Sequence, residues 1–325
     1  MHQTVLILGA RGRFGFAATK AFADAGWQVV AQIRPNATIP VQHSPEASVR
    51  WLTVDLNDTA ALVEQACDAQ VVVNALNPAY SSVAWRDQGL PLMEASIAAA
   101  RGLRATLMFP GNVYNFGRGM PKLLCEDTPQ LADTVMGRVR VDLESRAEAS
   151  EVRAVVIRAG NFFGSGRGTV FDQVLVKDVR KGHITYPGDA DIPSAWAYLP
   201  DLARAFVAVA ERRAALPEFE VLHFAGHCLT GRDWQDALTR VAHAQHWANG
   251  DEPLKLKQLP WLVIRLGSLV APTWEAMVSL RYLWHVAHAL DNTKLVRLIG
   301  AEPHTPLDAA APAALRELGH LDSPV

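Results

Sequence analysis

The sequence predicts an α/β protein with a doubly wound parallel sheet, and three features carry this prediction. Six apolar runs of strand length alternate with alanine-rich segments of helical length. These runs are apolar almost throughout, as expected of parallel strands that helices cover on both faces. The first run leads into a glycine-rich turn that opens a helix. The predicted strands are 4–8, 28–33, 49–54, 71–74, 105–109 and 154–158.

The glycine-rich turn predicts a dinucleotide site. Gly9 makes the tight turn, Gly12 lets the backbone approach a pyrophosphate, and Gly15 lets helix and strand pack closely. The phosphates would then face free N–H groups at the start of the helix. We therefore expect a Rossmann-type domain whose cofactor contacts the whole turn: Gly9, Ala10, Arg11, Gly12, Arg13, Phe14 and Gly15.

The pattern changes after residue 158, where glycines cluster, predicted strands shorten and loops lengthen. We expect a cofactor-binding Rossmann domain over 1–165 and a smaller C-terminal substrate domain over 166–325. A helix at 202–212 and a strand at 220–224 would return segment 195–225 to the main sheet. The smaller domain is thus expected to be interleaved with the larger one.

Composition excludes several classes of partner. The chain has 325 residues, 50% of them hydrophobic, and a net charge of −2, so we expect no nucleic-acid and no membrane partner. Its 3 scattered cysteines form no disulfide or metal pattern. The chain enters its first predicted strand directly, without a signal-peptide pattern. We expect a cytoplasmic protein without a metal.

The end of the second predicted strand bears on the choice of cofactor. An acidic residue there would bond the free ribose hydroxyl of NAD, whereas an arginine accommodates the 2′-phosphate of NADP. The chain has Arg34 at this point and no Asp or Glu before Glu46. Arg11 and Arg13 could bond the same phosphate. We predict NADP(H), the alternative being that all three arginines are merely solvated.

Over most of its length the chain resembles the extended short-chain dehydrogenase/reductase family, which includes nucleotide-sugar epimerases and dihydroflavonol-reductase-like enzymes. The resemblance implies that residues after successive strands border the cofactor. The matching segments besides the glycine turn are Asp55-Leu56, Asn74-Ala75, Val113-Tyr114, the run 158–164 with Gly160, the run 199–205, and Leu298-Ile299-Gly300. Asp55 has an alternative role in capping a turn.

The catalytic positions of that family are altered here. The family uses a serine, a tyrosine that exchanges the proton, and a lysine that lowers the tyrosine pKa and holds the nicotinamide ribose. The resemblance places Pro110 in the serine position, Met136 in the tyrosine position and Arg140 in the lysine position. Met136 has no exchangeable proton. Arg140 stays cationic and could still bond ribose hydroxyls.

Tyr114 is the nearest alternative proton donor, with Asn112 and Asn115 as hydrogen-bond partners. Alternatively, Tyr114 is a residue that only packs in the core. The catalytic candidates are therefore Tyr114 and Arg140, and geometry must decide between the two roles of the tyrosine.

The substrate is expected to be a small molecule. The nucleotide-sugar members of the family carry a phosphate-binding arginine shortly before the position of Asp201, but this chain has the run 194–198 with Trp196 there. We predict an NADP(H)-dependent oxidoreductase that acts on a small, fairly apolar carbonyl or conjugated compound. The alternative is a non-catalytic NADP(H)-binding redox sensor.

A C-terminal run has helical spacing: Trp274, Met277, Arg281, Trp284 and His288. Such a stripe is typical of a core helix. The alternatives are a lid over the substrate or the surface of a homodimer. The whole of 254–290 is expected to be a buried or interface helix pair, because charged residues and prolines interrupt it.

Overall fold

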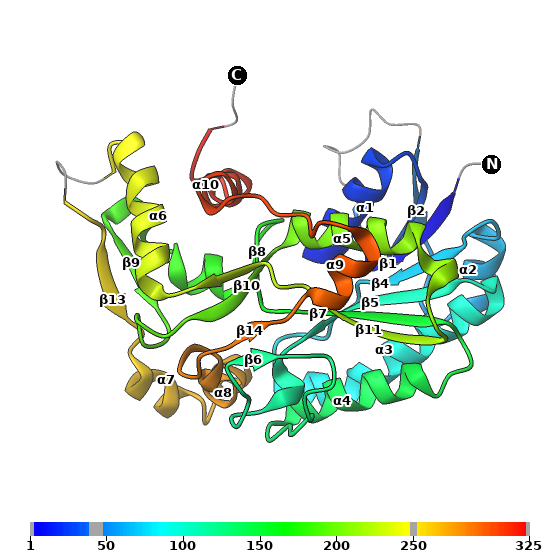
Figure 1. The fold of residues 1–325 in the computed structure, drawn as a ribbon, viewed down its shortest axis with the longest axis horizontal. Helices are drawn as coiled ribbons and strands as arrows, with labels where there is room; N and C mark the ends of the chain where they lie inside the picture. The colour runs from blue at the N-terminus through cyan, green and yellow to red at the C-terminus, as the bar shows by residue number, and fades with distance from the viewer. Residues whose placement is uncertain (1–2, 39–47, 248–251, 323–325) are drawn as a thin grey trace.

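The computed structural model describes residues 3–38, 48–247 and 252–322. Its centre is a parallel sheet of seven strands in the order β11-β7-β5-β4-β1-β2-β3 (Figure 1). The predicted fold class is confirmed. The order reverses between β1 and β4, and ligands of such sheets bind in the crevice at this point. The strands are β1 (Thr4–Leu8), β2 (Gln28–Ile33), β3 (Val49–Thr53), β4 (Val71–Asn74), β5 (Thr106–Asn112), β7 (Ala154–Ala159) and β11 (Phe219–His223).

Helices cover both faces of the sheet, which explains the continuous apolar strands. Alternate residues of β1 face opposite sides: Val5 and Ile7 join one core, Leu6 and Leu8 the other. The first face carries α1 (Arg13–Asp24), α5 (Leu199–Glu211) and α9 (Thr293–Ile299). The second carries α2 (Thr59–Gln65), α3 (Ser82–Leu103) and α4 (Val135–Glu148).

A smaller lobe has its own core, in which Phe163, Trp196 and Trp234 pack together. Its sheet of three strands has the order β12-β10-β8, and β9 pairs with β13. Helices α6 and α10 pack against each other beside it (Figure 1). The bounds are β8 (Asn161–Phe163), β9 (His183–Tyr186), β10 (Ser194–Tyr198), β12 (His227–Leu229), β13 (Lys255–Gln258), α6 (Gly231–Ala244) and α10 (Leu307–Glu317).

Segment 195–225 does not return to the main sheet as a whole. Helix α5 packs on α1, and β11 pairs with β7 at the edge of the large sheet. Strand β10, however, pairs with β8 and β12 in the small sheet. A side chain at Gly160 would collide with the carbonyl group of Ala195, so this glycine lets β10 lie directly against the end of β7.

The C-terminal stripe does not form one helix, which corrects that prediction. Helix α8 (Pro272–Ser279), preceded by α7 (Trp261–Gly267), ends before a short 3-10 turn over Arg281–Trp284. Three successive residues of this turn are buried, which one face of an α-helix cannot achieve. The chain then enters β14 (Ala289–Leu290), which pairs with β6 (Leu123–Leu124).

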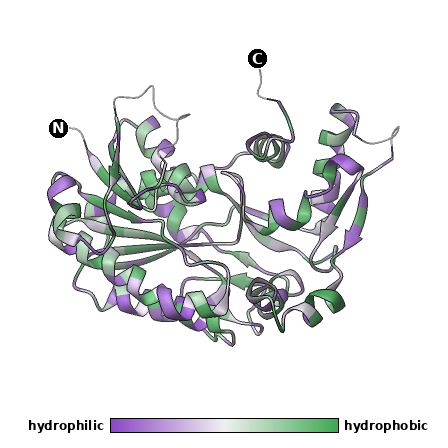
Figure 2. Cartoon of the chain, turned by 180° about the vertical axis from the view of Figure 1, so that it is seen from behind, coloured by the Kyte–Doolittle hydropathy of each residue, from purple (hydrophilic) through white to green (hydrophobic). Residues whose placement is uncertain are grey.

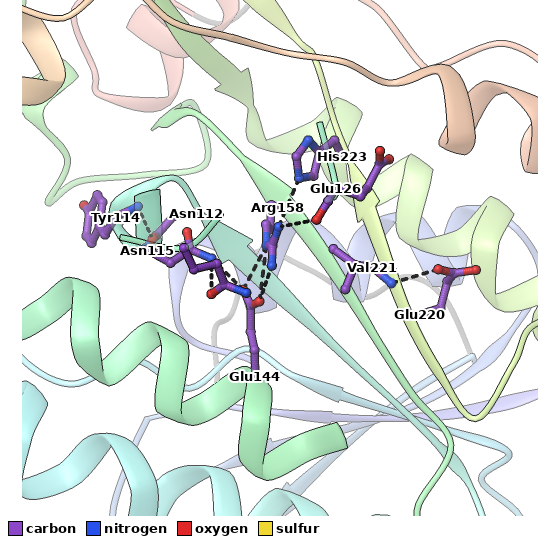
Figure 3. Close-up of polar contacts among 10 residues, drawn as sticks. Asn112, Tyr114, Asn115, Glu126, Glu144, Arg158, Glu220, Val221 and His223 are labelled. Atoms are coloured by element: carbon purple, nitrogen blue, oxygen red, sulfur yellow. Dashed lines mark hydrogen bonds and ion pairs between the residues drawn. The ribbon is translucent and has the colours of Figure 1, made fainter. Parts of the chain in front are cut away.

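A buried ion pair joins the large sheet to α4 (Figure 3). Arg158 of β7 binds Glu144 of α4 through two nitrogens, with Nη2–Oε2 at 2.6 Å and Nε–Oε1 at 3.1 Å. Both side chains are almost inaccessible to water. The amide of Asn115 lies 3.3 Å from Glu144 Oε1. The pair therefore also holds the turn that follows β5.

His223 of β11 completes this network. Its Nε2 lies 3.4 Å from Arg158 Nη1, and its Nδ1 lies 3.0 Å from the carbonyl oxygen of Leu124. Burial, together with the Arg158 charge, lowers the pKa of His223 to about 4. The ring is therefore neutral at pH 7, with its proton on Nδ1 and Nε2 accepting from Arg158.

We predict that Glu144→Gln lowers the free energy of unfolding by about 3–5 kcal/mol, because it leaves a buried guanidinium without its counterion. Urea denaturation of the purified protein measures the change. Glu94→Gln, which breaks the exposed pair with Arg146, is the matched control and should cost less than about 1 kcal/mol. Equal costs for both variants would contradict a structural role for the buried pair.

Candidate cofactor and active site

The glycine turn lies between β1 and α1, at the carboxyl end of the sheet. A Cβ atom on Gly15 would collide with the carbonyl oxygen of Gly9, so only glycine fits there. Gly12 is the N-cap of α1, and no side chain caps the first turn of the helix. Its N–H groups therefore suit a phosphate. The Phe14 ring packs against Phe206 in the core at 4.7 Å between centroids, so Phe14 offers a ligand only its backbone.

Gln32 holds the glycine turn against the neighbouring strands. It is buried at the end of β2, and its Oε1 accepts a hydrogen bond from the N–H of Gly9 at 3.1 Å. Its Nε2 donates to the carbonyl oxygen of Val54 at 2.8 Å. The backbone N–H of Ala10 also donates to the carbonyl oxygen of Gln32 at 3.0 Å. The turn is thus fixed before any ligand binds.

The three arginines expected at the ribose phosphate do not converge. Arg11 and Arg34 are exposed, and Arg34 follows β2. Arg13 instead donates to the carbonyl oxygen of Arg167 at 3.1 Å, on the opposite side of β1 from β2. Burial lowers the pKa of the Arg13 guanidinium, and the nearby carboxylate of Asp172 partly opposes this effect. Arg13 is therefore directed toward the segment after β8 and not toward the end of β2, where Arg34 lies.

The other expected cofactor residues lie at the carboxyl ends of their strands. Asp55 follows β3, and its Oδ1 accepts a hydrogen bond from the N–H of Asn57 at 2.9 Å. This contact agrees with the alternative interpretation of Asp55 as a residue that caps a turn. Leu56 packs against the core. Asn74 ends β4 and accepts from the N–H of Leu76 at 3.0 Å. Ala75 borders Gly9. Gly160 lies between the end of β7 and the start of β8.

Tyr114 follows β5, and neighbours fix its backbone on both sides. Its N–H donates to Asn112 Oδ1 at 3.0 Å, and its carbonyl oxygen accepts from the hydroxyl of Tyr282 at 3.3 Å. The hydroxyl of Tyr80 interacts with that of Tyr114 and lowers the pKa of Tyr114, which partly opposes the effect of burial. Burial still raises the pKa of both phenols. Tyr114 is therefore protonated at neutral pH.

Two guanidinium groups lie within electrostatic reach of the Tyr114 oxygen. Arg140 and Arg13 both favour its ionised form, Arg140 more strongly. Arg140 lies over the Trp85 ring, 4.7 Å from its centroid, and the same ring lies 6.0 Å from that of Tyr114. The structure thus brings the two catalytic candidates, Tyr114 and Arg140, to one site.

Arg140 keeps only part of its hydrogen-bonding capacity within the protein. Its Nη1 donates to the carbonyl oxygen of Pro110 at 3.2 Å, and its Nη2 to Asn77 Oδ1 at 3.4 Å. Its buried Nε has no partner, and such an atom suits a hydroxyl of a bound ligand. Met136, one turn earlier on α4, is completely buried in the core.

Sequence reasoning missed several residues at this site. Tyr80 and Asn77 belong to the loop after β4, next to the recognised Asn74-Ala75 pair. The rule that ligands bind outside the carboxyl ends of parallel strands could have indicated this loop. Nothing in the sequence singled out Trp85 or Asp172. Over the described ranges, no three His, Cys, Asp or Glu side chains are grouped to hold a metal ion.

Comparisons with known proteins agree with this architecture. Residues 1–100 match the model of the NmrA-like family. None of the curated proteins matches the chain. Among solved structures, UDP-glucuronic acid 4-epimerase from Bacillus cereus in complex with NAD is similar, with a TM-score of 0.74 and 15% identity, covering 99% of this chain and 100% of that one.

Two further solved structures have similar folds. UDP-glucose 4-epimerase from Brucella ovis, in complex with NAD, has a TM-score of 0.70 and 16% identity over 98% of each chain. TunA, an NAD-dependent NDP-hexosamine 5,6-dehydratase, has a TM-score of 0.72 and 16% identity, covering 98% of this chain and 99% of that one. The resemblance to extended short-chain dehydrogenases/reductases is thus confirmed at the level of the fold.

We predict that Gln32→Leu lowers the free energy of unfolding by about 2–4 kcal/mol, because it leaves the N–H of Gly9 and the carbonyl of Val54 without their partner. Urea denaturation measures this. Gln65→Leu changes an exposed glutamine on α2 and should stay within about 0.5 kcal/mol of the parent. A Gln32→Leu protein as stable as this control would show that Gln32 does not hold the turn.

Proposed function

We propose that the protein is an NADP(H)-dependent oxidoreductase that reduces a small, fairly apolar carbonyl or conjugated compound. The observation that carries this proposal is the Tyr80–Tyr114 pair beside Arg140 at the sheet edge that bears the glycine turn. The similar structures include NAD complexes of epimerases, which supports a nicotinamide dinucleotide here. The shape of the glycine turn, its uncapped helix and the unpartnered Arg140 Nε fit such a group.

Tyr114 is the proposed proton donor. A nicotinamide bound at the glycine turn would supply the hydride. The Tyr114 hydroxyl gives its proton to the carbonyl oxygen of the substrate. In this mechanism the Tyr80 hydroxyl, whose interaction with Tyr114 lowers the pKa of Tyr114, donates to the Tyr114 oxygen and leaves the Tyr114 proton for the substrate. Arg140 and Arg13 stabilise the phenolate that remains. Because burial raises the pKa of Tyr114, the phenol carries its proton at neutral pH, as a proton donor in a reduction requires.

The preference for NADP rests on Arg34 and Arg11. Both are exposed beside the turn that begins the dinucleotide site. Arginine binds phosphate through several N–H groups at once. The described part of β2 and the residues after it, up to residue 38, carry no carboxylate that would bond a free ribose hydroxyl. These features support NADP without excluding weaker binding of NAD.

The main test is turnover of a protein with an altered proton donor. We expect Tyr114→Phe to lower kcat about 10²–10⁴-fold, because phenylalanine has no proton to give, with an almost unchanged Kd for NADPH. Oxidation of NADPH, followed by absorbance with aldehydes, ketones, enones and quinones, measures kcat. Tyr80→Phe should cause a smaller loss.

Tyr186→Phe is the matched control, since this tyrosine lies in the core of the small lobe, and it should leave kcat unchanged. Equal kcat for Tyr114→Phe and the parent would remove Tyr114 from the mechanism. Tight NADPH binding with no turnover of any of these compounds would instead favour the redox sensor.

Cofactor preference has a separate test. We expect Arg34→Asp to weaken NADPH binding roughly 10- to 100-fold, because it replaces a charge-assisted hydrogen bond with repulsion, and to leave NADH binding nearly unchanged. Isothermal titration calorimetry measures both Kd values. Arg86→Asp, at an exposed position on α3, is the control. Equal losses for the two cofactors would refute the role of Arg34 at the 2′-phosphate.

A further inference from the structure

The α7–α8 hairpin carries an exposed aliphatic surface. Six of the eleven large hydrophobic residues that are exposed in the described ranges fall within 262–274, so the exposure is concentrated in one place. We call five of them the apolar tip, and their exposed fractions run from 55% to 86%. Figure 2 shows the hydrophobic colour of α7 at the edge of the molecule. The tip consists of Leu262, Val263, Leu266, Leu269 and Val270.

The hairpin carries a small excess of positive charge, although the whole chain is weakly acidic. Residues 261–281 contain Arg265, Arg281 and one acidic residue, Glu275, and Lys255 and Lys257 precede them on β13. Two of these basic residues border the tip directly, because Arg265 and Arg281 line a recess of about 220 Å³ together with Leu262. The positive charges and the aliphatic surface therefore share one side of the hairpin.

Two tryptophans flank the tip. Trp261 begins α7, its Nε1 donates to the carbonyl oxygen of Pro187 at 2.8 Å, and the Arg281 guanidinium lies 4.9 Å from the ring centroid. Trp274 on α8 is partly exposed. Aliphatic residues with tryptophan and arginine around them are typical of helices that lie in a membrane interface. Helices that could cross a bilayer are absent from the described residues.

We propose that the α7–α8 hairpin docks the protein on an anionic lipid surface, with the apolar tip inserted among the lipids and Arg265 and Arg281 on the headgroups. This proposal departs from the expectation, based on the net charge of the chain, that the protein has no membrane partner. A second copy of the chain fits this surface less well. In a two-fold interface, Glu275 would be the only acidic residue of the other copy's 261–281 segment available to these two arginines. Anionic headgroups provide the opposite charge, worth about 1 kcal/mol for each basic residue near the surface.

Docking would also orient the candidate active site. Helix α8 packs against α3, and Glu275 of α8 lies within electrostatic reach of Tyr80. The docked hairpin thus places the Tyr80–Tyr114 pair close to the lipid, where an apolar substrate accumulates. This consequence rests on the proposed function, whereas the docking itself does not.

The test uses the full chain without cofactor or substrate. It is sedimented with vesicles of phosphatidylcholine alone and with vesicles that contain about a third phosphatidylserine. We expect binding to the anionic vesicles that weakens with added salt. Leu266→Asp combined with Leu269→Asp should weaken it at least about tenfold, because charged side chains do not enter the lipid.

Leu123→Asp combined with Leu131→Asp changes exposed leucines outside the hairpin and should leave binding unchanged. Arg265→Gln combined with Arg281→Gln should remove most of the preference for anionic vesicles. Circular dichroism checks that each variant is folded. Absence of binding by the parent chain, or equal binding by the parent and the Leu266 and Leu269 variant, would overturn the proposal.

Sedimentation velocity tests whether a second copy of the chain, and not a lipid surface, covers the apolar tip. A parent chain that forms a dimer, does not bind vesicles, and becomes monomeric on Leu266→Asp would make the hairpin an interface between copies, and the lipid proposal would be wrong. None of these measurements requires turnover. Failure of the docking proposal is therefore distinct from failure of the proposed reaction.

Discussion

The buried pair of Arg158 and Glu144 is the constraint on which the candidate site depends. It ties the end of β7 to α4, and through Asn115 it holds the turn that carries Tyr114 (Figure 3). A charge can stay in such a place only when its partner is held in good geometry. The sheet edge and α4, which supplies Arg140, are therefore fixed relative to each other, and the groups around the phenol have little freedom to move apart.

In the proposed reaction, the site keeps a positively charged framework and takes its proton donor from a different position than the family does. Arg140 is cationic on α4, whereas Met136, one turn earlier, belongs to the core. The phenols come instead from the loops after β4 and β5. Proton transfer needs a phenol at the right place and not at a given point of the chain. Under the proposed function, Tyr114 with Tyr80 meets this need beside Arg140.

Much of the fold could be predicted from the sequence, because strands buried on both faces leave a continuous apolar run. Strands β1, β2 and β4 have the expected bounds, and β3, β5 and β7 differ by a few residues. The stripe from Trp274 to His288 was misjudged, because its spacing runs across two elements: Trp274 and Met277 lie on α8, whereas Arg281 and Trp284 lie in the 3-10 turn. The direction of Arg13 and the approach of Tyr80 to Tyr114 do not follow from residue spacing, since both depend on contacts between separate segments of the chain.

By itself the sequence determined the order of strands and helices, the glycine turn at the first crossover and the presence of Met136 and Arg140 one turn apart on one helix. These are local properties, set by periodicity and by residue type. Only the tertiary structure decided that Arg13 turns toward Arg167, that Tyr80 meets Tyr114, and that the apolar residues of α7 and α8 stay exposed. Contacts between distant segments decide which side chains are buried and which stay exposed to water. These contacts cannot be deduced from composition or from residue spacing along the chain.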